Sequence, residues 1–429
     1  MKFDLLHPAD QLVMMMERIY GYGMTTTSGG NLSIKDENGD IWITPAGIDK
    51  GSLTDKDIVQ VKPDGTVVGK HRPSSELPFH RSTYKQRPDV RAVLHAHPPA
   101  LVSFSIVRKL PDTRLIPDVN LICGEVDIAE YGLPGSEELG DKIANVLKRG
   151  INTVILENHG IIVVGKNLFE AFMSFETLDF SARLEISARG IGNPVSLTSK
   201  HVEISKNKNN AEMKEFIQKS YSSEERLARK EMCKLIHRAY DQRLFTSTQG
   251  TFSTRIDDNS FIITPFGIDR KYLDVEQIVR IENNCREYGK MPSRSVTLHN
   301  SIYQKHSHVN SIIIAHPFNI MTYAVTGEPF DSRTIPESYI LLRDIPKLPF
   351  GSSFMQPSMV ADLFVPSTPI ALVENDCVIV TGSSLLNAYD RLEVAEYSAK
   401  ALIATKNLGD VVSINEPQIE DIKEAFKLD

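Results

Sequence analysis

Apolar side chains recur at helical spacing in four long segments of the chain. Residues 8–22 and 224–243 predict amphipathic helices, because their apolar residues return every three or four positions. Residues 168–189 and 385–406 show the same spacing and end near glycine or asparagine, as helices commonly do. The pattern therefore predicts an opening helix and a closing helix, and each of them occurs twice.

Short β-rich segments lie between these helices. Residues 30–45 contain two apolar runs joined by Asp-Glu-Asn-Gly-Asp, and residues 59–68 turn through Pro63-Asp64-Gly65, so both predict hairpins. Hairpins between terminal helices predict an α/β or α+β sandwich with a mixed or mostly antiparallel sheet. No Gly-x-Gly-x-x-Gly opens a helix after a strand, which argues against a Rossmann nicotinamide-binding domain.

The chain repeats itself at a nearly constant spacing. Gly30-Asn31-Leu32-Ser33 returns as Gly250-Thr251-Phe252-Ser253, and Ile43–Asp49 returns as Ile263–Asp269. Further pairs keep the same order: His97-Pro98 with His316-Pro317, Glu157-Asn158 with Glu374-Asn375, and Ser181-Ala182 with Ser398-Ala399. We therefore expect two related domains, residues 1–195 and 216–429, with a linker at 196–215.

Composition narrows the classes of function and partner. A net charge of −7 and a pI near 6.0 provide no basic face for a phosphate backbone, so we expect no nucleic-acid partner. The four cysteines form no Cys-x-x-Cys pair, so a metal would need histidine or carboxylate ligands. Without a secretory signal or an apolar run of about 18 residues, the sequence predicts a cytoplasmic protein that does not bind membranes.

Three histidines are candidate metal ligands. Residues 91–98 predict a buried strand, on which His95 and His97 project from the same face. His159 follows the strand-like residues 153–156 and precedes Gly160. Three imidazoles with an open position are typical of a catalytic metal site, although each histidine alone could equally be a hydrogen-bonded core residue.

Polar turns supply the other candidate residues. Glu76 begins a predicted helix after two serines, where it could serve as a favourable helix-start acid or as a carboxylate that moves a proton on a substrate. Small residues and hydroxyls in three turns could bind an anion through backbone N–H and O–H groups, or could simply form the turns. They are Gly30, Asn31, Ala46, Gly47, Ser74 and Ser75.

These motifs together resemble the class II aldolase/adducin family, which includes L-fuculose-1-phosphate aldolase. Gly-Asn-Leu-Ser, Ile-Thr-Pro-Ala-Gly, Pro-Ser-Ser-Glu, His-Ala-His-Pro and Asn-His-Gly occur in the family's order. The resemblance covers nearly all of residues 8–190 and returns, weaker, from about 225 to 406. It implies a three-layer sandwich with a central, mostly antiparallel sheet flanked by helices, present twice.

The resemblance also implies roles for the candidate residues. His95, His97 and His159 match the family's zinc ligands, with manganese or cobalt as other choices, and Glu76 matches its acid/base. The six turn residues match the substrate-phosphate pocket. The implied reaction is retro-aldol cleavage of a phosphorylated ketose or a sugar acid, in which the cation stabilises the enediolate.

Alternative activities stay open within the resemblance. Family epimerases tend to carry aspartate where Glu76 stands, which favours an aldolase, and dehydration or decarboxylation of a sugar acid phosphate uses related chemistry. The fuculose enzyme has a tyrosine proton donor shortly after an Ile-Pro pair, whereas Asp118 follows Ile116-Pro117 here. Asp118 and Tyr131 are therefore candidates for the second proton-transfer group.

An alternative outside the enzymes is an adducin-like interaction protein without catalysis.

The second copy lacks most of these residues. His95, His159 and Glu76 correspond to Ile314, Asp376 and Ser295, whereas His97 is retained as His316. Asn31 and Ser74 of the phosphate turns correspond to Thr251 and Arg294. We expect a degenerate domain kept for architecture. The resemblance also implies assembly into four-fold rings. A homodimer of this fused chain could therefore form a pseudo-four-fold ring.

Overall fold

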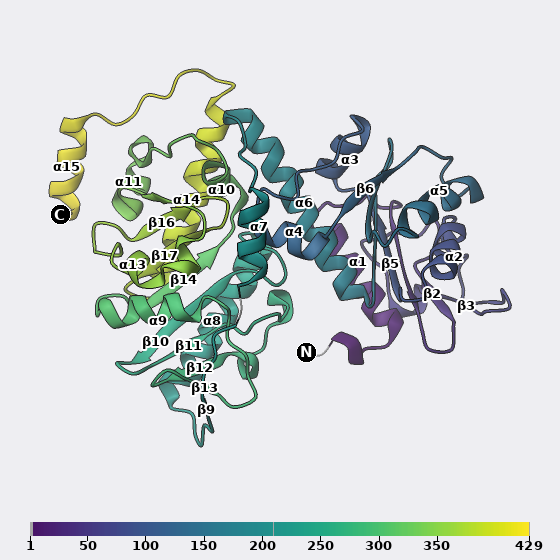
Figure 1. Ribbon diagram of the computed structural model, residues 1–429, viewed down its shortest axis with the longest axis horizontal. Helices are drawn as coiled ribbons and strands as arrows, with labels where there is room; N and C mark the ends of the chain where they lie inside the picture. Colours follow the sequence, from purple (N-terminus) through teal and green to yellow (C-terminus); the bar gives the residue numbers. More distant parts are fainter. Residues whose placement is uncertain (1–2, 209, 429) are drawn as a thin grey trace. The chain divides into compact units, whose positions relative to one another are not determined.

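The computed structural model describes residues 3–208 and 210–428. Two compact units divide the chain: an N-terminal unit of residues 3–113 and 118–183, and a C-terminal unit of residues 114–117 and 184–428. Figure 1 shows that each unit contains a sheet with helices packed against it. The chain therefore has a mixed α/β fold with two sheets.

The N-terminal half intersperses helices and strands along the chain. The helices are η1 Phe3–Leu5, α1 Pro8–Gly21, η2 Asp55–Asp57, α2 Leu77–Gln86, α3 Pro99–Ile106, α4 Pro117–Cys123, α5 Glu137–Leu147 and α6 Leu168–Ile191. The strands are β1 Asn31–Lys35, β2 Ile41–Ile43, β3 Val59–Val61, β4 Val67–Val68, β5 Ala92–Ala96, β6 Val126–Ala129, β7 Thr153–Leu156 and β8 Ile161–Gly165.

Over the described residues, these strands form one sheet in the order β4-β3-β2-β1-β5-β8-β7-β6. Neighbouring strands are antiparallel except β6 and β7, so the expected mostly antiparallel sheet is present. The central strand β5 lies between β1 and β8, with His95 opposite Asn31 on one side and Ile162 on the other. This register fixes the position of His95 in the middle of the unit.

Helices α2 and α5 cover one face of this sheet and build its core. Ser136 caps α5 by accepting a hydrogen bond from the Leu139 N–H, and Leu139, Ile143 and Leu147 then return at helical spacing and are buried. They belong to one apolar cluster with residues of α2 and the strands, such as Phe79 and Val93. Burying each such side chain contributes roughly 1.5–3 kcal/mol.

The C-terminal half repeats this layout. Its helices are α7 Ser199–Lys206, α8 Ser223–Asp241, η3 Arg270–Tyr272, η4 Val275–Gln277, α9 Val296–Lys305, α10 Phe318–Ala324, η5 Ser332–Thr334, α11 Pro336–Leu342, α12 Ser352–Met355, α13 Pro357–Ala361, α14 Leu385–Thr405 and α15 Glu416–Phe426. Its strands are β9 Glu215–Phe216, β10 Thr251–Asp257, β11 Ser260–Ile263, β12 Val279–Glu282, β13 Cys285–Glu287, β14 Ser311–Ala315, β15 Lys347–Leu348, β16 Ile370–Val373 and β17 Cys377–Gly382.

The second sheet has the strand order of the first, with one addition. Over the described residues its order is β15-β16-β17-β14-β10-β11-β12-β13-β9. Strand β14 occupies the place of β5, and β10 the place of β1, with Thr251 opposite Ile314. Strand β9 pairs in parallel with β13 and has no counterpart in the first sheet. The two halves that repeat in sequence therefore also share the same strand order.

The four predicted helices are present as α1, α8, α6 and α14, each within about two residues of its expected ends. Residues 196–215, where we expected a linker, contain α7 and the first residue of β9. The domain boundaries at 195 and 216 stay a prediction. In the described part of the chain, no helix combines the length and apolarity that crossing a bilayer demands.

Candidate metal centre

The end of strand β5 presents two imidazoles on one side. Strand alternation sends His95 and His97 to the same face, and His95 is fully buried. The backbone N–H of His97 donates to the Met24 carbonyl at 3.2 Å, which fixes the chain just beyond the strand. Position 30, which lies next to His95, requires glycine. A Cβ there would lie 2.8 Å from the His95 carbonyl oxygen, and Gly30 has a φ of +70°.

The turn between β7 and β8 carries the third imidazole. Asn158 adopts a left-handed conformation with a φ of +54°, and the His159 N–H donates to the Leu156 carbonyl at 3.1 Å. A side chain at Gly160 would meet the Ala96 carbonyl oxygen at 2.6 Å. Only glycine therefore lets this tight turn approach the end of β5.

The three rings converge. Their ligand nitrogens all lie within 4.8 Å of one another, and in the described part of the chain no other such group of three histidine, cysteine or acidic ligands occurs. His95 Nδ1 lies 2.9 Å from the Ile161 carbonyl oxygen and must donate to it, so a neutral ring directs the lone pair of Nε2 into the cluster. His97 Nε2 lies 3.0 Å from this atom. Such a donor set fits a divalent transition metal.

Burial keeps the rings in the form that binds a metal. Desolvation, followed by the neighbouring imidazoles, lowers the pKa of His95 and of His97 to about 3. Desolvation also lowers the pKa of His159, while the nearby Glu76 carboxylate opposes this shift. All three rings are therefore neutral at pH 7 and can offer lone pairs to a cation.

Glu76 stands at the N-cap position of α2, and its side chain faces the same cluster instead of capping the helix. Its Oε2 lies 3.3 Å from His95 Nε2 and accepts a hydrogen bond of 2.7 Å from Asn31 Nδ2. Its Oε1 lies 3.8 Å from His159 Nε2 and is buried without a hydrogen-bond partner among the described residues. Among the described residues, one carboxylate oxygen is thus held by a hydrogen bond from Asn31, and the other is not.

The turns expected to bind phosphate pair with one another. The Ala46 N–H donates to the Arg72 carbonyl at 3.0 Å, and the Ser74 N–H donates to the Thr44 carbonyl at 3.2 Å. Gly47 has a φ of +67°, and Ser74 is buried while Ser75 is exposed. The structure therefore brings Ala46, Gly47, Ser74 and Ser75 onto two adjoining loops beside Glu76.

The two candidates for the second proton-transfer group lie on other segments. Asp118 is partly buried in the first turn of α4. Tyr131 is 51% exposed on the loop after β6, and its backbone carbonyl accepts a hydrogen bond from Lys142 Nζ. Their part in catalysis stays a prediction.

Sequence reasoning missed three residues behind Glu76. Ser33 Oγ lies 2.7 Å from both His80 Nδ1 and Tyr84 Oη, and all three side chains are buried. His80 Nε2 in turn contacts Asn31 Oδ1. The repeat offered a signal for them, because Ser33, His80 and Tyr84 return as Ser253, His299 and Tyr303.

The corresponding position in the C-terminal unit is built differently. Ile314 is 7% exposed at the place of His95, and Asp376 accepts a hydrogen bond from Ser353 Oγ at 2.5 Å at the place of His159. The turn is preserved, since Asn375 has a φ of +51° like Asn158. The backbone of the site is therefore retained, and two of the three imidazoles are replaced, with His316 kept at the place of His97.

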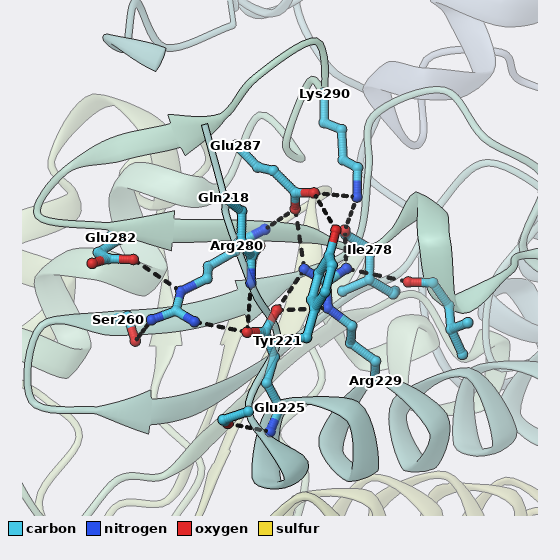
Figure 2. A network of polar contacts seen from close by, with 12 residues as sticks. Gln218, Tyr221, Glu225, Arg229, Ser260, Ile278, Arg280, Glu282, Glu287 and Lys290 are labelled. Atoms are coloured by element: carbon cyan, nitrogen blue, oxygen red, sulfur yellow. Dashed lines mark hydrogen bonds and ion pairs between the residues drawn. The ribbon is translucent and has the colours of Figure 1, made fainter. Parts of the chain in front are cut away.

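Charged residues gather instead around helix α8, where Figure 2 shows a polar network. Arg229 lies 2.7 Å from Glu225 and 3.1 Å from Glu287, and the three residues are at most 5% exposed. Arg280 contacts Glu225 at 2.7 Å, and Lys290 contacts Glu287 at 2.6 Å. The network joins α8 to strands β12 and β13.

Comparison with known proteins supplies the family context. The family described as Class II Aldolase and Adducin N-terminal domain matches residues 10–186 and again residues 230–403. An L-fuculose phosphate aldolase of Methanocaldococcus jannaschii is 31% identical over 41% of this chain and 94% of its own. A 3-oxo-tetronate 4-phosphate decarboxylase of Haemophilus influenzae is 28% identical over 42% of this chain and 87% of its own.

Among solved structures, YgbL from Escherichia coli, described as a putative aldolase/epimerase/decarboxylase, is 26% identical to this chain. It covers 46% of this chain and 96% of its own, with a TM-score of 0.43.

Proposed function

The chain belongs to the class II aldolase and adducin family, and from this premise we propose that its N-terminal half is a metal-dependent carbon–carbon lyase. Its substrate is a phosphorylated ketose or a related sugar acid, as the names of its fuculose-phosphate and deoxyribulose-phosphate aldolase relatives suggest. The observation that carries the proposal is the convergence of His95, His97 and His159 beside Glu76.

His95, His97 and His159 would hold the cation, and zinc is the metal we propose. The donor set fits: three neutral imidazoles offer nitrogen ligands, and Glu76 Oε1 is a buried oxygen without a hydrogen-bond partner in the described part of the chain. When bound, the cation supplies Lewis-acid stabilisation of negative charge on substrate oxygens.

Glu76 performs the proton transfer in this proposal. Asn31 holds Oε2, so the carboxylate keeps one orientation, and Oε1 takes a substrate proton and returns it. The turns that contain Gly30, Asn31, Ala46, Gly47, Ser74 and Ser75 bind the phosphate through N–H and O–H donors. Asp118 or Tyr131 serves as the second proton-transfer group.

The C-terminal half is a degenerate copy of the three-layer sandwich in this proposal. It holds no cation, because Ile314 and Asp376 replace two imidazoles and Ser295 replaces the acid. We further propose a homodimer that forms a pseudo-four-fold ring. A monomeric mass in solution together with full activity would contradict that assembly.

Decarboxylation is the second candidate, favoured by the 3-oxo-tetronate 4-phosphate decarboxylases among the relatives. A screen of the metal-loaded protein against phosphorylated and free ketoses and 3-oxo sugar acid phosphates separates the two reactions. An aldolase releases a triose-phosphate-sized fragment and an aldehyde, whereas a decarboxylase releases carbon dioxide. Absence of turnover across the whole panel would refute the lyase.

A further inference from the structure

A chain of buried hydrogen bonds runs behind Glu76. Tyr84 Oη lies 2.7 Å from Ser33 Oγ, which lies 2.7 Å from His80 Nδ1. His80 Nε2 contacts Asn31 Oδ1, and Asn31 Nδ2 lies 2.7 Å from Glu76 Oε2. The five side chains are at most 8% exposed, so bulk water does not compete for these bonds.

From Ser33 onward, each donor in this hydrogen-bond chain points towards Glu76. Asn31 donates its amide hydrogen to the carboxylate, so its carbonyl oxygen faces His80 and needs a donor there. A neutral His80 must therefore carry its hydrogen on Nε2, and Nδ1 accepts the hydroxyl hydrogen of Ser33. Burial favours this neutral form by lowering the pKa of His80 well below its ordinary value. Aligned donors polarise one another and strengthen the last bond.

The C-terminal half contains the first part of the same hydrogen-bond chain but lacks its connection to an acid. Ser253 Oγ lies 2.6 Å from His299 Nδ1 and 2.7 Å from Tyr303 Oη, which repeats the first three residues. In the described structure, however, His299 Nε2 is buried without a hydrogen-bond partner, and Thr251 bonds to Ser293 instead. The serine, histidine and tyrosine are thus common to both halves, whereas the connection to an acid belongs to the first alone.

We propose that His80 is a positioning residue for proton transfer, acting through Asn31 on Glu76. The chain holds Glu76 Oε2 and thereby assigns Oε1 as the atom that carries the proton. This inference rests on the proposed lyase function. Without the Nε2–H donor, the Asn31 amide is free to turn over and direct its oxygen at the carboxylate, which repels Glu76 from its orientation.

Matched substitutions in the two halves test the inference. His80→Leu is expected to lower kcat by about 10- to 100-fold, as displacement of a reacting group by about 1 Å can do, with KM within about twofold of wild type. Metal content should be unchanged. His80→Gln places an amide N–H near the position of Nε2 and should restore kcat to within about threefold of wild type.

His299→Leu is the control, because His299 is equally buried and has the same serine and tyrosine partners. It should leave kcat unchanged even where it lowers the unfolding midpoint. Equal losses of kcat in His80→Leu and His299→Leu would overturn the inference. A His80→Gln protein that folds and binds metal but is as slow as His80→Leu would also overturn it.

A substrate-free measurement separates this inference from the proposed function. Imidazole ¹⁵N shifts of selectively labelled protein report which nitrogen of His80 carries the hydrogen, and we expect Nε2. A hydrogen on Nδ1 would overturn the inference whatever the activity. If the wild-type protein turned over no substrate while His80 carried its hydrogen on Nε2, the lyase would fail and the hydrogen-bond chain would stand.

Discussion

The two halves of the chain share a strand order and differ in where they bury charge. The N-terminal half places three imidazoles and a carboxylate at the end of its central strand. The C-terminal half has Ile314 at that point and buries its charges around Arg229, between α8 and strands β12 and β13. The positions 220 residues before Glu225, Arg229 and Arg280 are Leu5, Ala9 and Gln60.

This difference distinguishes residues that stabilise the fold from residues that serve the proposed reaction. An isoleucine on the central strand gains free energy on burial, whereas neutral imidazoles and a carboxylate lose hydration there. The C-terminal half shows that the topology forms without those polar groups. The N-terminal half therefore carries a cost that a bound cation would offset.

The largest expected difference between the halves follows from removing a metal ligand. His95→Ala should lower metal content from about one per chain towards zero and reduce activity by about 10³-fold or more, since several kcal/mol of charge stabilisation is lost. Elemental analysis with activity assays checks both. His316→Ala is the control and should retain the metal. Metal loss in His316→Ala would place a cation in the C-terminal half and reverse the comparison.

Removing the acid/base should have the next largest effect. Glu76→Gln is expected to reduce kcat by about 10²- to 10⁴-fold while the protein keeps its metal, because general acid–base catalysis contributes about that much. Steady-state kinetics on the metal-loaded protein measure this. Ser295→Gln, the equivalent substitution in the other half, should leave kcat at the wild-type level. A fully active Glu76→Gln protein would rule out the proposed mechanism.

The ionic network around Arg229 should stabilise the fold and should not contribute to catalysis. Arg229→Met removes the buried cation that Glu225 and Glu287 share and leaves each acid with one other cation, so we expect a loss of up to about 3–5 kcal/mol in the free energy of unfolding. Denaturant unfolding measures it. Lys423→Met, which breaks an exposed pair with Glu420, should leave stability close to wild type. Equal effects of the two substitutions would show that burial does not set the importance of the network.

The smallest expected effect is a change in the stability of the same network at acidic pH. Burial alone would raise the pKa of Glu287, but hydrogen bonds from Lys290, the Arg280 N–H and Arg229 outweigh burial and leave the pKa below its ordinary value of 4.5. Glu287 therefore stabilises the fold fully above about pH 4.5, and this contribution is lost as pH falls through the lower folded-state pKa. The stability difference between wild type and Glu287→Gln should shrink below pH 4.5. A difference that is constant with pH would contradict this.

Local patterns in the sequence predicted the four long helices, the two hairpins and the strand that carries His95. Strand alternation predicted that His95 and His97 share a face, and the repeat predicted the shared topology. The hydrogen-bond chain through Ser33 and His80 could not be predicted in the same way. It joins β1 to α2 across 47 residues, and it depends on how α2 packs against the sheet, which no local pattern describes.

The ionic network was equally hidden. Glu225 and Arg229 have the spacing of an ordinary exposed helical pair, and nothing local distinguishes them from Glu138 and Lys142, which are such a pair. Burial of Arg229 depends on β12 and β13 packing against α8. Long-range packing therefore decides which charged pairs become structural.

Strand β9 gives the second sheet a protected border. In the described residues the first sheet ends at β4, a two-residue strand whose Val67 and Val68 are 47% and 46% exposed. The second sheet would end at β13, but β9 pairs along it and satisfies the backbone groups that would otherwise recruit a foreign strand. Trimming residues 211–220 would uncover β13 and favour edge-to-edge strand pairing between copies, so shortened forms of this half are best designed to retain β9.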